Sequence, residues 1–281
     1  MQQQNSICDF ATSDSWVILS PIEQSIKKKI EAVGTPLKDW DINIYRGVLT
    51  GCNEAFIIDS QKRDEILANC QTEDERKRTA ELIRPILRGR DIKRYGYVDN
   101  GLYLINTHNG VRGRIPRIKI EDYPAVKAHL DQYWDRIATR ADKGDTPYNL
   151  RNCAYLEDFF KPKITWGNLN LEGTYSYAPE GMFINAPSPF IATTNIAILH
   201  ILNSTIADYY IRSLGVTRNG GYFEYKPMFV EKLPVPKTGL DKLMSYPTQP
   251  SQKQKQEMAA IIYQLYGLSQ QEIDYLENRE L

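Results

Sequence analysis

The stretch from 161 to 193 restricts the fold most, because it divides into four short strand-like pieces separated by Pro, Gly and Asn. A helical pattern follows at 195–214, and Asn203-Ser204 in its middle is expected to break it in two. Helices and short, mostly antiparallel strands that occur in separate blocks favour an α+β fold over a wound parallel sheet.

The remaining segments fit the same interpretation. Ser20 as N-cap and Pro21 at the first helical position predict a helix over 20–33. Further along the chain we expect two strands in 41–58 around a turn at 50–53, two helices in 60–87, a strand at 102–106 and a helix at 123–140. Residues 239–250 look like a linker, and 251–281 like two helices capped by Ser251 and Ser269.

Composition excludes several classes of protein. The chain of 281 residues is long enough to fold without disulfides or metal. Its four Cys include no C-x-x-C pair, which suits a reducing cytoplasm, and its three His make a histidine metal site improbable on composition. Neither a signal peptide nor an 18-residue apolar run is visible, so we expect a cytoplasmic protein without a membrane partner.

Charge is distributed unevenly although 35 basic residues balance 35 acidic ones. The segment 84–119 holds nine basic residues and two acids, a net charge of +7. It predicts a phosphate-contacting surface that includes Arg88, Arg90, Lys93, Arg94, Arg112 and Arg114. The alternative is a solvated loop and strand face.

The segment 218–226 is a second candidate for nucleic-acid contact. Arg218, Asn219 and Tyr222 offer donors and an aromatic ring beside two glycines. An ordinary hairpin would explain the same pattern.

Catalytic motifs are missing from the sequence. It contains no Asn/Asp-Pro-Pro-aromatic motif of an amino methyltransferase, no Gly-rich dinucleotide loop and no P-loop. Three acid-x-Lys triplets begin at Glu75, Asp91 and Glu224, and leave a metal-dependent nuclease as an alternative, although such triplets arise readily by chance. A protein-interaction module using the last two helices is a second alternative.

Several motifs occur in the order typical of one family. They are YRGVLTGCNEAF at 45–56, ILRGRDIKRY at 86–95, the YP, HL and Arg140 elements within 123–140, FKPKI at 160–164, LNS at 202–204 and LPVP at 233–236. In this order the chain resembles the C-terminal specificity domain of TaqI-like and type IIG restriction-modification adenine methyltransferases.

The resemblance implies a target recognition domain over 20–238, preceded by a lead-in at 1–19 and followed by the linker and helical tail at 239–281. It implies a bacterial, non-catalytic module that binds double-stranded DNA beside an N-terminal methyltransferase part, with or without a nuclease, which this sequence lacks. S-adenosylmethionine is expected in that missing part, and no cofactor, metal or catalytic residue in this chain. The expected DNA-binding residues are Arg46, Thr50, Asn53, Arg88, Arg90, Lys93, Arg94, Arg112, Arg114, Lys163, Arg218, Asn219 and Tyr222.

Overall fold

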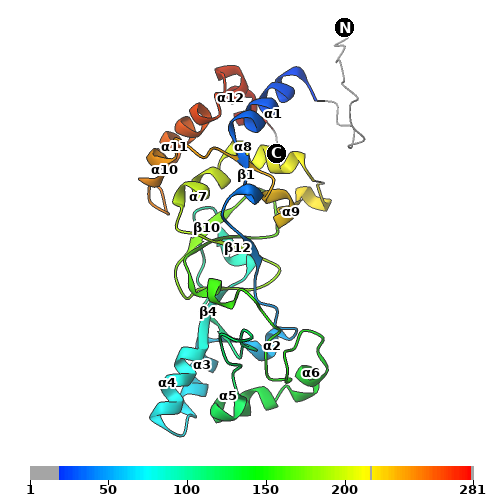
Figure 1. The fold of residues 1–281 in the computed structure, drawn as a ribbon, viewed down its shortest axis with the longest axis vertical. Helices are drawn as coiled ribbons and strands as arrows, with labels where there is room; N and C mark the ends of the chain where they lie inside the picture. Colours follow the sequence, from blue (N-terminus) through cyan, green and yellow to red (C-terminus); the bar gives the residue numbers. More distant parts are fainter. Residues whose placement is uncertain (1–18, 216, 280–281) are drawn as a thin grey trace.

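Two hydrophobic cores organise the chain, one in each lobe of an elongated molecule (Figure 1). The computed structural model describes residues 19–215 and 217–279. A four-stranded antiparallel sheet in the order β10-β8-β12-β2 lies between the lobes. Neighbouring residues of β12 point to opposite faces of this sheet, so that Phe190 packs in the lower core and Ile191 in the upper one. The prediction of an α+β fold is confirmed.

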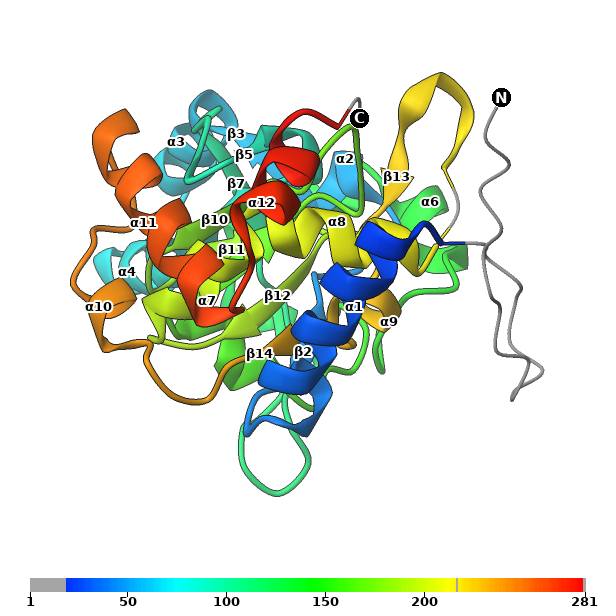
Figure 2. The same cartoon turned by 90° about the horizontal axis from the view of Figure 1, so that it is seen from above.

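The upper lobe is mainly helical. Figure 2 shows helices α1, α8, α11 and α12 spread across this end of the molecule. Its helices are α1 (Pro21–Val33), α7 (Ile196–Leu202), α8 (Thr205–Ser213), α9 (Pro227–Val230), α10 (Asp241–Met244), α11 (Gln252–Leu265) and α12 (Gln270–Glu277). The short sheets here pair β1 (Thr35–Pro36) with β14 (Pro234–Val235), and β9 (Leu169–Asn170) with β13 (Phe223–Glu224).

The lower lobe is built around a second four-stranded sheet in the order β11-β4-β7-β3, in which only β11 and β4 run parallel. Its strands are β3 (Ile57–Asp59), β4 (Ile83–Leu87), β7 (Leu102–Ile105) and β11 (Phe183–Ile184). Its helices are α2 (Asn53–Phe56), α3 (Ser60–Ala68), α4 (Glu73–Leu82), α5 (Pro124–Asp131) and α6 (Trp134–Thr139).

The central sheet and one small ribbon complete the fold. The strands of the sheet between the lobes are β2 (Ile44–Arg46), β8 (Lys163–Trp166), β10 (Tyr175–Ala178) and β12 (Pro189–Ala192). The ribbon pairs β5 (Ile92–Lys93) with β6 (Gly96–Tyr97). The strand block predicted at 161–193 is therefore confirmed, and it supplies three strands of the central sheet.

Local capping explains why the helix starts were predictable. Ser20 and Glu23 form a reciprocal capping box at α1, and Ser251 and Ser269 cap α11 and α12 in the same way. The break at Asn203-Ser204 is confirmed too, since Ser204 is the N-cap of α8.

Three expectations about local structure were wrong. Residues 41–58 do not form a hairpin, because β2 and β3 belong to different sheets and α2 lies between them. The second helix in 60–87 ends at Leu82, and the chain continues as β4, in which Pro85 occurs. The helix expected over 123–140 is two helices, interrupted at 132–133.

The C-terminal tail packs on the upper lobe. Met258, Ile262, Tyr266 and Leu276 belong to the same core as Ile26 of α1. Within 239–250, α10 buries Leu243, so this segment is partly helical and contributes to the core. Of the expected lead-in at 1–19, all but Leu19 lies outside the described residues. Over the described ranges, no helix is both long and apolar enough to cross a membrane.

Candidate nucleic-acid interface

A buried ion pair fixes the turn that carries the first basic residues. Asp91 is 4% exposed and accepts hydrogen bonds from the backbone N–H, Nε and Nη2 of Arg88, at 3.0, 2.9 and 3.0 Å. Asn100 donates a further bond to its carboxylate at 2.9 Å. Burial by itself would raise the pKa of Asp91, but the hydrogen bonds and charge of Arg88 outweigh it and hold the pKa below its ordinary value. Asp91 therefore orients Arg88.

The neighbouring cations on this turn are exposed. Among the described residues, neither Arg90 nor Lys93 lies within ion-pair distance of a carboxylate, and Lys93 Nζ donates only to the carbonyl of Arg90, at 3.1 Å. Arg94 pairs with Glu172 at 3.2 Å and also reaches the carbonyl of Gly173. The turn thus presents two positive charges without acidic partners, those of Arg90 and Lys93, next to the buried pair of Arg88 and Asp91.

The motifs at 45–56 and 86–95 are in contact with the same residue, Ser188. Gly47 donates its backbone N–H to the carbonyl of Ser188 at 2.9 Å, and a Cβ on Gly47 would lie 2.6 Å from the carbonyl oxygen of Ile184. A Cβ on Gly89 would lie 2.6 Å from the Ser188 hydroxyl. Both glycines therefore allow backbone and Ser188 to pack closely. The residue after Arg46 and the start of the 88–94 turn therefore both pack on Ser188.

Arg46 borders a groove in the lower lobe. Two adjoining pockets of about 260 and 540 Å³ share Asn152 and Cys153 in their walls; Arg46 lines the first, and Arg112 lines the second. Both arginines are exposed, and no carboxylate of the described residues pairs with either. Arg114 and Arg117 are instead paired, with Glu157 at 2.9 Å and with Asp145 at 3.0 Å. The groove therefore offers two free guanidinium groups to an anionic ligand.

The segment 217–226 forms a hairpin, as the structural alternative proposed. Thr217 pairs antiparallel with Phe223 across its turn, and its strand β13 also pairs with β9. Arg218 and Lys226 both bind Glu224, at 3.0 and 2.7 Å. Tyr222 is 43% exposed, and Asn219 is exposed in the tip. All three residues expected to contact DNA here are thus exposed to solvent, and Arg218 is in addition paired with Glu224.

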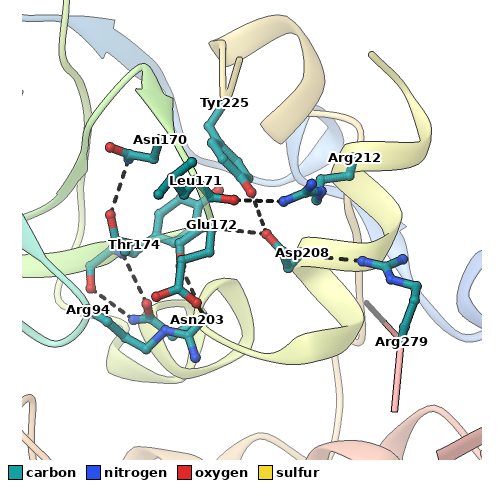
Figure 3. Close-up of polar contacts among 12 residues, drawn as sticks. Arg94, Asn170, Leu171, Glu172, Thr174, Asn203, Asp208, Arg212, Tyr225 and Arg279 are labelled. Carbon is teal, nitrogen blue, oxygen red and sulfur yellow. Dashed lines mark hydrogen bonds and ion pairs between the residues drawn. The ribbon is translucent and has the colours of Figure 1, made fainter. Parts of the chain in front are cut away.

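The loop 170–174 beside this hairpin is anchored by a buried aspartate (Figure 3). The carboxylate of Asp208 accepts hydrogen bonds from Gly173 N and Tyr225 Oη, at 2.9 and 2.5 Å. Arg212 donates to the carbonyl of Leu171 at 2.8 Å, and Arg94 reaches the loop from the basic segment. The network joins the loop beside the hairpin to Arg94 of the 88–94 turn.

Thr50, one of the expected contact residues, lies inside the protein and is hydrogen-bonded there. Thr50 is 2% exposed; its hydroxyl is engaged with Asn53 and Cys52, and its carbonyl accepts a hydrogen bond from Arg140. Thr50 therefore stabilises the turn. Asn53, the other expected contact residue of this motif, is exposed.

Lys163 lies fully buried in β8. Its ammonium group donates to the carbonyl of Met182 at 2.9 Å. Burial lowers its pKa to about 8. This burial was not predictable from the sequence, because a Lys next to Pro162 is equally typical of a surface position. In this conformation neither Thr50 nor Lys163 is available to DNA.

The acid-x-Lys triplets do not form open metal sites. Glu75 is 3% exposed and accepts from the backbone of Gln71 and Ala125, at 2.8 and 2.9 Å. The other two carboxylates, Asp91 and Glu224, are neutralised by basic side chains as described above. Within the described ranges, no group of three acidic, His or Cys side chains could hold a metal ion.

Sequence reasoning missed several residues of this surface. Arg151 lines the groove and pairs with Asp142 at 3.0 Å, and Leu169 and Leu171 are 51% and 54% exposed beside the hairpin. No sequence motif marks Arg151, and leucines in a strand pattern are predicted to be buried. Only the fold reveals their place.

Comparison with known proteins gives the family. The family model of the TaqI-like C-terminal specificity domain matches residues 84–235, more than half of the chain. The chain belongs to this family. The matched part includes the 88–94 turn and the 217–226 hairpin, whereas the motif at 45–56 lies before it.

Two solved structures share the fold. One is the type IIL restriction-modification enzyme MmeI in complex with DNA, with a TM-score of 0.57, 13% identity, and coverage of 86% of this chain and 35% of that chain. The other is the type IIG restriction endonuclease BpuSI, with a TM-score of 0.51, 13% identity, and coverage of 88% and 28%. This chain thus spans about a third of their length. No curated protein matches it.

These findings confirm the prediction of a TaqI-like specificity domain. They do not favour the nuclease or the protein-interaction alternative. The apolar residues of the last two helices, on which the interaction alternative depended, pack largely into the upper core.

Proposed function

We propose that this chain selects a DNA sequence without catalysing a reaction itself, and that a separate methyltransferase part, with or without a nuclease, acts on the selected site. Support comes from the 88–94 turn, where Arg90 and Lys93 carry uncompensated charge on a base fixed by Arg88 and Asp91. Rigid cations of this kind bind backbone phosphates and gain by releasing counterions.

Readout of bases is assigned to the exposed residues beside this turn. Asn219 and Tyr222 occupy the hairpin tip, and the Asp208 network holds the adjoining loop in place. Amide and guanidinium groups can read base edges in the major groove, and an aromatic ring can pack on a base. We assign the groove between Arg46 and Arg112 to the same duplex as a second phosphate contact.

Salt titration of DNA binding tests this proposal. The protein is titrated with a pool of random-sequence duplexes at several salt concentrations. Replacing Arg90 and Lys93 together with Ala should lower the slope of log K against log salt by about two, since each lost phosphate contact changes the slope by about one. Lys28→Ala is the matched control, because Lys28 is an exposed lysine on α1, away from the proposed surface. Equal slopes for the double variant and wild type would contradict the assignment.

Two further measurements test whether the chain reads bases and whether it catalyses a reaction. Repeated selection from the pool should converge on one short sequence if the chain alone reads bases. Incubation with S-adenosylmethionine and Mg²⁺ should neither methylate nor cut DNA. Cleavage that Lys93→Ala or Lys226→Ala abolishes would instead establish the nuclease alternative.

A further inference from the structure

A hairpin at 111–115 in the lower lobe carries an Arg-Gly-Arg tip. The N–H groups of Val111 and Ile115 each donate to the other residue's carbonyl at 2.9 Å, and Arg114 N–H donates to the carbonyl of Val111 at 2.9 Å. Residues 112–114 form the tip between them. Gly113 has a φ of 77°, the left-handed conformation that the third residue of a type II turn requires. The shape of the turn therefore explains the glycine at this position.

The tip projects from the surface. A Cβ placed on Gly113 would meet no atom within 4 Å, and all three residues of the tip are exposed. Among the described residues, Arg112 has no ion-pair partner. Arg114 binds Glu157 at 2.9 Å and the carbonyl of Ala154 at 3.4 Å, but its side chain is 58% exposed, and exposed pairs contribute little. The tip thus offers Arg112 freely, and Arg114 can exchange its carboxylate partner for another acceptor.

Both legs of the 111–115 hairpin are fixed to the body of the lobe. On the first leg, Gly110 N–H donates to Nδ1 of His108 at 3.2 Å, and a Cβ on Gly110 would clash with the carbonyl oxygen of Ile115. After the second leg, Ile118 donates its N–H to the carbonyl of His108 at 3.1 Å, and its own carbonyl accepts from the buried amide of Asn149 at 2.9 Å. The hairpin is therefore preorganised, and little conformational freedom is lost when the tip binds.

The chemistry of the tip fits the minor groove of DNA. Guanidinium groups only donate hydrogen bonds, and the floor of the minor groove at A·T pairs presents only acceptors, whereas guanine adds an amino donor there. The groove is about 6 Å wide, and it narrows in A-tracts, where its negative potential attracts arginine. A glycine between two arginines adds no side chain to a tip that has to enter so narrow an opening. The surrounding segment 100–120 contains no acidic residue that would oppose this approach.

We propose that the tip formed by Arg112, Gly113 and Arg114 inserts into the minor groove of the bound duplex and reads A·T pairs there. This role rests on the proposed function and deepens it, because it gives the lower lobe a part in recognition as well as in phosphate contact. Arg112 lines the pocket that adjoins the groove of Arg46. A DNA strand whose phosphate lies in that groove would form one wall of the minor groove that the tip enters.

Two matched pairs of duplexes test minor-groove reading with the whole chain. Inosine in place of guanine removes the amino group from the minor groove and keeps the hydrogen-bonding pattern of G·C pairs in the major groove. The chain should bind the inosine duplex about tenfold more tightly than the G·C duplex, the size of one good contact to a base edge. In an A·T duplex, 2,6-diaminopurine in place of adenine adds the amino group and should weaken binding by a similar factor.

Two variants locate the reading group. Arg112→Ala should bring both affinity ratios close to one, because the free guanidinium is lost. Arg76→Ala is its matched control, since Arg76 is an exposed arginine of α4 that lines neither pocket of the groove. Gly113→Ala keeps every charge, so it should lower the ratios but leave the salt slope of DNA binding unchanged. Gly181→Ala is the control for this change, because Gly181 has a φ of 74° and equally open surroundings.

Equal affinities of the wild type for the inosine and G·C duplexes would overturn minor-groove reading, and so would a preference that survives both Arg112→Ala and Gly113→Ala. If Arg112→Ala lowers the salt slope by about one while the paired duplexes bind equally, Arg112 contacts a phosphate only and the assignment of the tip to base reading is wrong. If none of the duplexes is bound, the proposed function itself fails, and minor-groove reading fails with it.

Discussion

The carboxylate of Asp91 holds the guanidinium of Arg88 at two points, Nε at 2.9 Å and Nη2 at 3.0 Å. This fork-like contact leaves Arg88 little freedom to reach DNA and gives it the task of shaping the turn. The residues that meet DNA in our proposal are consequently its neighbours, Arg90 and Lys93.

Asp91→Asn should destabilise the protein by about 2 kcal/mol, because bonds from a charged donor to a buried carboxylate become neutral ones. The pKa of Asp91 is lower in the folded state than in the unfolded state, where it is near 4. The stability that Asp91 contributes is therefore complete above about pH 4, and it disappears as the pH falls through the pKa of the folded state. Urea unfolding at pH 7 and pH 3 measures this. Glu81→Gln, at an exposed position on α4, should change stability little. A variant as stable as wild type at pH 7 would count against the role of Asp91.

Arg140→Lys should destabilise the lower lobe, even though it keeps the charge. The buried guanidinium donates to four backbone carbonyls, those of Thr50, Asp142, Pro147 and Asn149. An ammonium group is a compact point charge and cannot reproduce this planar arrangement. Burial lowers the pKa of Arg140 to about 10, which marks how far the group is removed from water.

We expect a loss of about 2–4 kcal/mol in urea unfolding, from buried carbonyls left without donors. Arg136→Lys is the control, because Arg136 is exposed and bound to Glu54 alone. Comparable losses in the two variants would show that the buried geometry is not the cause.

Lys163→Met should leave DNA affinity unchanged, because the ammonium group is buried on Met182. It should also change how stability depends on pH. The folded pKa of about 8 lies below the unfolded value, so the unfolded chain binds more protons between about pH 8 and 10.5. Wild type should therefore gain stability relative to the variant as pH rises through this range.

Denaturant unfolding of both proteins at pH 7.5 and 10 gives that difference. Lys161→Met, on the exposed neighbour, should show no such trend. A DNA affinity that falls with Lys163→Met but not with Lys161→Met would restore Lys163 to the interface.

Glu272→Gln should loosen the contact between α12 and α1. Its carboxylate binds Ser25 and Lys29, each at 2.7 Å, as well as the cap of its own helix. Burial would raise the pKa of Glu272, but these partners, with Lys29 foremost, lower it to about 2. Its contribution is thus present above the unfolded value near 4.5 and lost as pH falls toward 2.

Acid titration of the folded fraction should show the variant losing less stability than wild type between pH 4.5 and 2, from a lower starting point at pH 7. Glu257→Gln, in which the exposed partner of Lys253 is changed, should follow wild type. Parallel curves for Glu272→Gln and wild type would refute the linkage.

Local signals in the sequence were reliable where a structure depends on neighbours along the chain. Ser20, Ser204 and Ser269 cap helices because the acceptor and the donor lie three residues apart. The strand block at 161–193 was readable from its turn residues for the same reason. The family followed from the order of motifs, none of which is specific alone.

The candidate site was less predictable, because burial is decided by distant parts of the chain. Lys163 and Thr50 occur in family motifs that suggested contact with DNA, yet Met182 and Arg140 occupy them. Asp208 looked like any polar residue of a helix, and only the fold brings Gly173 and Tyr225 to it. A motif can thus mark residues that shape a surface as readily as residues that touch the ligand.

Helices α1 and α12 lie together, joined by Glu272 and by the bond from Tyr275 to Glu23 at 2.9 Å. The described chain therefore enters and leaves the fold at one place, at the end of the molecule far from the lower lobe (Figure 1). The last two helices and α1 thus close the upper lobe as one packed unit, so the two described ends of the domain cannot move independently of each other.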